Sequence, residues 1–198
     1  MWGEFIRTRV LEDVPHRHLV FSIPKMLRSF FKHNRKLLTD LCRCGWKAIT
    51  QYLEIEQPGD LPAAIVSIQT AGDFLNWNSH LHALVTSGTF RSDGSFEPIL
   101  LMQENVLREL FEAEVFKLLV KKELISREFI GKMRTWRHSG FHVYAGPAVT
   151  DIQDAVRVGL YIVRPSASSG RLQLAQDPGW LKYLAKGSQP HPYSDSLF

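Results

Sequence analysis

The chain has 198 residues, 44% of them hydrophobic and 22% charged, which is typical of a folded globular domain and excludes a mainly disordered or fibrous protein. The formal net charge of +4 is only a weak indication of a polyanionic partner. No run approaches the ~18 apolar residues of a membrane span, and the charged start lacks the apolar segment of a signal peptide. We therefore expect a cytoplasmic protein with no membrane partner.

Charge is distributed unevenly along the chain. Residues 1–50 hold 10 Lys and Arg against 4 Asp and Glu, residues 51–114 hold 2 against 10, and residues 115–198 hold 12 against 6. Two basic segments therefore flank an acidic one. Solvated helix faces are the simpler interpretation, and a basic groove for nucleic acid is the alternative.

The first third of the chain predicts a strand followed by a long helix. Residues 18–23 read as a strand that Pro24 closes. Residues 25–53 carry apolar side chains at helical spacing and are predicted to form one amphipathic helix. Its second side is a basic stripe, made of Lys25, Arg28, Lys32, Lys36, Arg43 and Lys47.

The remaining elements follow in the order expected of a sheet with helices packed on it. Strands are predicted at 63–69, 81–86 and 140–145, with a hairpin turn at Asp93-Gly94. Helices are predicted at 104–124, 126–136 and 151–163, the last capped by Asp151. Beyond Arg171 the pattern becomes irregular. This order predicts an α+β fold.

The two cysteines, Cys42 and Cys44, are poorly placed for a disulfide framework and favour a reducing compartment. A zinc site combining them with His16 and His18 is conceivable. The one-residue cysteine spacing and the opposite directions of the two side chains on a helix argue against it.

A histidine pair is the most specific local feature. In His80-Leu81-His82 the two imidazoles point to one face of a strand, and Leu81 points into the core. Two nitrogens can bind one divalent ion, with Gln69 as the first candidate for a third ligand and Asp73 as the second. Mixed nitrogen and oxygen ligands suit Mg²⁺ or Mn²⁺. The alternative is a hydrogen-bonded pair with no metal.

A tyrosine lies on the polar side of the last predicted helix. Tyr161 stands between Arg157 and Arg164 at steps of four and three residues. Amphipathic packing is the usual role of such a tyrosine. Attack on a phosphate is the alternative, since neighbouring positive charge and a metal ion both lower the cost of forming the phenolate.

These motifs, taken in order, resemble those of the HUH transposases of rolling-circle insertion sequences, the two-tyrosine family. The matching segments are Val14 to Arg28, Ile68 to Asn76 running into His80-Leu81-His82, Ser87-Gly88, Asp93 to Phe96, Trp136 to Phe141 and Tyr161 to Pro165. The resemblance covers about residues 4–174. It is specific as an ordered set, although the histidine pair alone is not.

The resemblance implies metal-dependent nicking and strand transfer of single-stranded DNA through a 5′-phosphotyrosine. Tyr161 would be the nucleophile, and His80, His82 and Gln69 would bind Mg²⁺ or Mn²⁺. The implied fold is an antiparallel sheet with the histidine pair on a central strand and the tyrosine on a facing helix. Residues expected to contact the DNA are Arg137, His138, Arg157 and Arg164, with Trp136 or Trp77 stacking on a base.

The chain also departs from the family pattern. Pro165 occupies the place of the second tyrosine, so single-tyrosine chemistry is implied. The paired-cysteine zinc segment of relatives is missing at the N-terminus, and Asn78-Ser79 replaces a common His-Pro. We expect a catalytic core over 1–174 and an irregular, truncated tail over 175–198. Two alternatives to the transposase are an inactive remnant that binds single-stranded DNA and a metal hydrolase that uses water.

Overall fold

The protein is described here by a computed structural model, which covers residues 2–72, 76–164, 172–174 and 181–183. Its centre is a four-stranded sheet in the order β2-β3-β1-β6. The strands are β1 (His16–Ser22), β2 (Ala64–Ala71), β3 (Trp77–Thr86) and β6 (His142–Val149), and every pairing is antiparallel. The predicted α+β class is therefore confirmed.

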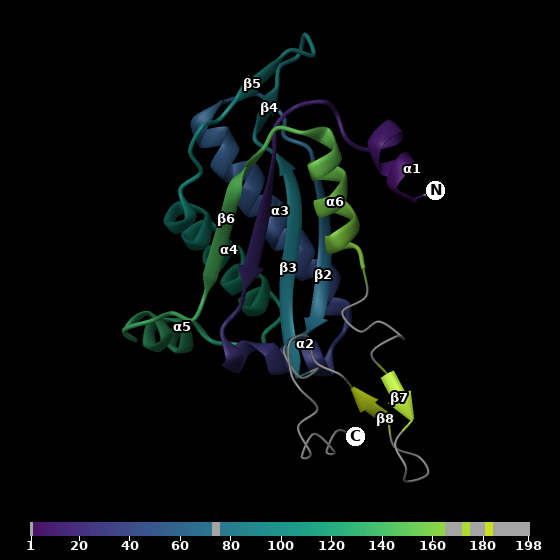
Figure 1. The fold of residues 1–198 in the computed structure, drawn as a ribbon. Helices are drawn as coiled ribbons and strands as arrows, with labels where there is room; N and C mark the ends of the chain where they lie inside the picture. The colour runs from purple at the N-terminus through teal and green to yellow at the C-terminus, as the bar shows by residue number, and fades with distance from the viewer. Residues whose placement is uncertain (1, 73–75, 165–171, 175–180, 184–198) are drawn as a thin grey trace.

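Helices cover the two faces of this sheet unequally. The long helices α3 (Lys36–Glu56) and α4 (Glu104–Lys121) lie behind the sheet in Figure 1. The shorter α6 (Ile152–Ile162) lies in front of β2 and β3, and no helix of the described residues lies in front of β1 and β6 (Figure 1). A helix that the sequence analysis did not predict, α1 (Trp2–Arg9), packs against α6.

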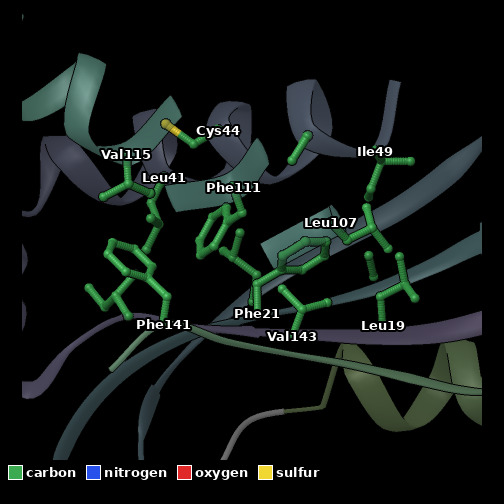
Figure 2. Packing of buried hydrophobic residues seen from close by; sticks show 14 of the residues in the cluster. Leu19, Phe21, Leu41, Cys44, Ile49, Leu107, Phe111, Val115, Phe141 and Val143 are labelled. Carbon is green, nitrogen blue, oxygen red and sulfur yellow. The ribbon is translucent and has the colours of Figure 1, made fainter. Parts of the chain in front are cut away.

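The hydrophobic core fills the space between the sheet and the two long helices (Figure 2). Alternate residues of the strands point into it, so that Leu19, Phe21 and Leu81 are fully buried. The Phe21 ring lies 5.0 Å from the ring of Phe111 on α4. Gly45 allows α3 to approach closely, because a Cβ there would lie 2.6 Å from Leu81 Cδ1.

The single helix predicted for 25–53 is wrong: the segment forms three helices. A 3₁₀ turn (Lys25–Leu27) leads into α2 (Arg28–His33), and α3 starts only at Lys36. At Asn34 the backbone leaves helical geometry, and its side-chain oxygen accepts a hydrogen bond from the Lys36 amide at 3.2 Å. Asparagine competes with the helix in this way. The predicted basic stripe is therefore divided between separate helices.

The hairpin predicted at Asp93-Gly94 is confirmed. Strands β4 (Gly88–Phe90) and β5 (Phe96–Pro98) pair antiparallel. Gly94 takes a positive φ of 85°, which glycine adopts without strain. The Asp93 carboxylate accepts hydrogen bonds from the Ser95 amide and hydroxyl.

The C-terminal half follows the predicted order with shifted boundaries. Helix α5 (Arg127–Arg134) is shorter than predicted, and β6 continues to Val149 instead of ending at 145. The predicted cap of α6 is confirmed, since the Asp151 carboxylate accepts hydrogen bonds from the amides of Gln153 and Asp154.

Beyond α6, β7 (Leu172–Leu174) and β8 (Leu181–Tyr183) pair antiparallel, so regular structure is present where only an irregular chain was expected. The rest of the predicted tail lies outside the described residues. Among the helices that the structure describes, none has the length and apolar character needed to span a membrane.

Candidate functional site

The candidate site is built on three consecutive residues of β3. Leu81 is fully buried and points into the core, opposite Phe21 of β1 and Ile68 of β2 in register. His80 and His82 point to the other face, where His80 is half-buried and His82 is 6% exposed. Because β3 starts at Trp77, earlier than predicted, both histidines lie inside a strand that has neighbours on both sides.

A third histidine joins this pair from β1. His18 Nε2 lies 2.9 Å from His82 Nδ1, and the two rings are stacked at 5.2 Å with an interplanar angle of 14°. His82 of β3 lies opposite Val20 of β1, and His18 is two residues before Val20 on the same face. His18 is therefore the diagonal cross-strand neighbour of His82. His18 was expected only in a cysteine-containing zinc site, because its contact with His82 depends on the register of two distant strands.

The backbone holds His80 in a defined orientation. His80 Nδ1 lies 2.8 Å from the carbonyl oxygen of Asn78. A carbonyl can only accept, so Nδ1 carries a proton, and the neutral form of the ring has its lone pair on Nε2. A ring nitrogen that donates to a carbonyl is the usual arrangement of a metal-binding histidine, whose other nitrogen is the ligand.

Helix α6 places Tyr161 beside the histidines. Gly159 sits against Leu84, which shares a sheet face with His82; a Cβ at Gly159 would lie 3.6 Å from Leu84 Cδ2. Two residues further, the Tyr161 ring meets the His82 ring edge to face at 6.1 Å and the His18 ring at 6.4 Å. Tyr161 is 57% exposed, so it is accessible from solvent although its ring contacts the histidines.

Burial favours the neutral imidazole in His82 and His18. It is the largest of the causes that together lower the pKa of His82 to about 4, and charge repulsion from the nearby His80 and His18 rings contributes the rest. Burial also lowers the pKa of His18. Neutral imidazoles retain a nitrogen lone pair, which is the form that binds metal ions and accepts hydrogen bonds.

The two candidates for a third metal ligand have different outcomes. Gln69 lies on β2 directly opposite His80 in the register and is half-buried, so its amide belongs to the same face of the sheet. Asp73 lies outside the described residues. Among the residues that the structure does describe, no three His, Cys, Asp or Glu side chains are grouped so as to hold a metal ion.

The rival zinc site with both cysteines does not form. Cys44 is buried and its Sγ donates to the Glu114 carbonyl at 3.5 Å, while Cys42 is a second free thiol on the same helix. His18 faces His82 instead.

The four residues expected to contact DNA are all exposed, in two places. Arg137 and His138 lie between α5 and β6, and Arg157 and Arg164 lie on and just after α6. Arg157 already pairs with Asp154. The predicted stacking residue Trp77 instead donates its indole N–H to the Arg28 carbonyl at 3.2 Å and is covered by the Arg35 guanidinium, whereas Trp136 is 46% exposed.

Comparisons with known proteins agree on one family. A family model of the Y2_Tnp type, described as "Putative transposase", matches residues 64–189, more than half of the chain. The chain is also 30% identical over 103 residues to the transposase for insertion sequence element IS801 of Pseudomonas savastanoi pv. phaseolicola. That match covers 52% of this chain and 25% of the relative, so the chain spans about a quarter of its length. No solved structure matches at a significant level.

Proposed function

Because this chain belongs to the Y2 family of insertion-sequence transposases, which act in DNA transposition, we propose that it nicks and rejoins single-stranded DNA through Tyr161. The observation that carries this proposal is the exposed Tyr161 ring set edge to face against His82 and His18. A nucleophile beside a cluster of neutral imidazoles suits chemistry on a phosphodiester.

The proposed reaction is a reversible transesterification. The Tyr161 hydroxyl loses its proton to solvent as its oxygen attacks the phosphorus, and the bond from phosphorus to the 3′ oxygen breaks. The 3′ oxygen takes up a proton and leaves as a hydroxyl, and the 5′ phosphate stays on the tyrosine. Attack of a 3′-hydroxyl on this phosphotyrosine rejoins DNA and frees Tyr161. One phosphoester bond replaces another at each step, so no external energy source is required.

The donor set at the site fits a divalent cation. The Nδ1 atoms of His80 and His82 are both engaged in hydrogen bonds, which leaves the two Nε2 atoms as ligands, with the Gln69 amide oxygen as the third. These residues would bind Mg²⁺ or Mn²⁺. The bound ion would act as a Lewis acid on the phosphate at the cleavage site.

DNA contacts are proposed for four exposed side chains, two on or just after α6 and two between α5 and β6. Arg164 follows Tyr161 by three residues, just after the end of α6, and its amide donates to the Tyr161 carbonyl at 3.3 Å. We assign Arg164, Arg157, Arg137 and His138 to the phosphate backbone. Such contacts fix the position of the strand and carry no sequence information.

The test is formation of a covalent protein–DNA adduct. The purified chain is incubated with end-labelled single-stranded DNA pools and Mn²⁺ or Mg²⁺, then run on a denaturing gel. We expect a shifted band that disappears after protease digestion. The band should not form when EDTA is present during the reaction, nor with Tyr161→Phe. Tyr144→Phe is the matched control, since Tyr144 is a second exposed tyrosine, 46% exposed, on β6, which pairs with β1 at the edge of the sheet.

The outcomes separate three functions. DNA binding without an adduct would support a binding remnant and contradict the proposal. Strand cleavage that survives Tyr161→Phe and is lost in His80→Ala would indicate a hydrolase that uses water. An adduct lost equally in Tyr144→Phe would also contradict the assignment of Tyr161.

A further inference from the structure

We infer that His18 is a positioning residue, which accepts a hydrogen bond from His82 and thereby holds His82 in the tautomer with a free lone pair on Nε2. The role of this tautomer in the reaction rests on the proposed function. The hydrogen bond and the tautomer themselves can be measured without DNA or metal.

Counting protons leaves two possible directions for the hydrogen bond, and the proposed role of His82 as a ligand selects one of them. A neutral imidazole has one N–H, so either His82 Nδ1 donates to His18 Nε2 or the reverse. If His18 donated, the His82 proton would sit on Nε2, and neither nitrogen of His82 would remain free. If His82 donates, its Nε2 presents a lone pair to the face that Tyr161 borders. Only the second arrangement makes His82 a ligand.

His80 provides an internal comparison on the same strand. Its Nδ1 donates to the Asn78 carbonyl at 2.8 Å, which fixes the lone pair on Nε2. His82 has His18 at 2.9 Å where His80 has the carbonyl. The two histidines are therefore held in the same way by different acceptors, one from the backbone of β3 and one from a side chain of β1.

The surroundings of His18 keep it in place. Its backbone pairs with Leu84 of β3, and its ring is stacked on the His82 ring at 5.2 Å. The Tyr161 ring touches it edge to face at 6.4 Å. The same imidazole thus contacts both the proposed ligand and the proposed nucleophile.

The test uses His18→Gln, His18→Asn and His18→Leu, with His142→Gln as a control. A glutamine amide reaches about as far as imidazole Nε2 and can accept the hydrogen bond, whereas an asparagine amide reaches only as far as Nδ1. His142 is an exposed histidine on β6, on the same face of the sheet as His80. Circular dichroism and a thermal melt establish that each variant is folded.

The first readout is the tautomer of His82 in the metal-free protein, from long-range ¹H–¹⁵N NMR spectra. We expect the Nδ1–H form in the wild type, His18→Gln and His142→Gln. We expect a mixture, or the Nε2–H form, in His18→Asn and His18→Leu. A wild type in the Nε2–H form would overturn the inference, as would an unchanged tautomer in folded His18→Asn.

The second readout is Mn²⁺ affinity by calorimetry. Loss of an outer partner weakens metal binding by about 10- to 100-fold, and we expect this for His18→Asn and His18→Leu, with His18→Gln close to wild type. Equal affinity in all variants would contradict the inference. Because neither readout uses DNA, failure of the adduct assay would leave this result standing, and failure here would leave Tyr161 as a candidate nucleophile.

Discussion

The two faces of the central sheet differ in chemistry although they are made by alternating residues of the same strands. Behind the sheet, Leu19, Phe21 and Leu81 are fully buried under α3 and α4. In front, His18, His80 and His82 lie beside the short helix α6. The first face stabilises the fold, and the second carries the groups suited to chemistry.

The helices on the two faces differ in how closely they approach. On the buried face, Gly45 of α3 stands where a Cβ would meet Leu81 Cδ1 at 2.6 Å. On the open face, Gly159 of α6 leaves ordinary contact distances of 3.6 Å to Leu84 and Ile6. A side chain at position 45 would therefore be too close to its neighbour, whereas a methyl group at position 159 would make ordinary contacts, so substitutions at the two helix contacts can be compared.

The largest expected effect is on the open face. His80→Ala should lower adduct formation at least about 10²-fold, because a Lewis acid contributes several kcal/mol to such reactions and His80 is proposed to hold it. The free energy of unfolding should change by less than about 1 kcal/mol, since His80 is only half-buried. Adduct yield and urea denaturation measure the two quantities. Undiminished cleavage by a folded variant would contradict the assignment of the metal site.

The adjacent residue should behave in the opposite way. Leu81→Ala removes a fully buried side chain and should destabilise the fold by about 2–5 kcal/mol. The fraction that remains folded should retain adduct formation, because Leu81 points away from the histidines. Urea denaturation, with activity corrected for the folded fraction, tests both points. A small stability change would show that the core can collapse around this position.

A pair of glycine substitutions compares the two helix interfaces directly. Gly45→Ala should cost about 1–2 kcal/mol net, because overpacking against the buried Leu81 exceeds the gain in helix propensity. Gly159→Ala should be neutral or stabilising by up to about 1 kcal/mol, since its contact distances are ordinary. Thermal or urea unfolding of both variants provides the comparison. Equal losses would mean that the two faces are packed alike.

The smallest expected effect is a pH dependence on the buried face. Burial raises the pKa of Cys44 to about 12, with the Glu114 carboxylate adding to the shift, against 9.0 for a free thiol. The unfolded chain therefore loses this proton first as the pH rises. The stability that Cys44 contributes is complete below pH 9 and falls between pH 9 and pH 12.

Cys44→Ala tests this contribution. From pH 8 to pH 10 the wild type should lose about 1 kcal/mol more stability than Cys44→Ala does, measured by urea unfolding with a reductant present. Identical pH profiles would show that the thiol ionises as readily in the folded protein as in the unfolded chain.

Much of this protein can be predicted from local sequence. The i, i+2 spacing of His80 and His82 puts both on one strand face with Leu81 opposite, because strand side chains alternate. The turn at Asp93-Gly94 and the cap at Asp151 follow from the backbone preferences of those residue types, and both are confirmed. The ordered motifs also indicated the transposase family, which the comparisons confirm.

The break at Asn34 is also local, because its side chain accepts a hydrogen bond from the amide of Lys36, two residues on, which periodicity does not register. Tertiary structure decided the rest. The contact of His18 with His82 joins residues 64 positions apart through the register of two strands. Tyr161 meets both rings because α6 packs on Leu84. Sequence spacing fixes which face a side chain takes within its own strand or helix, whereas packing between distant segments fixes which side chains meet.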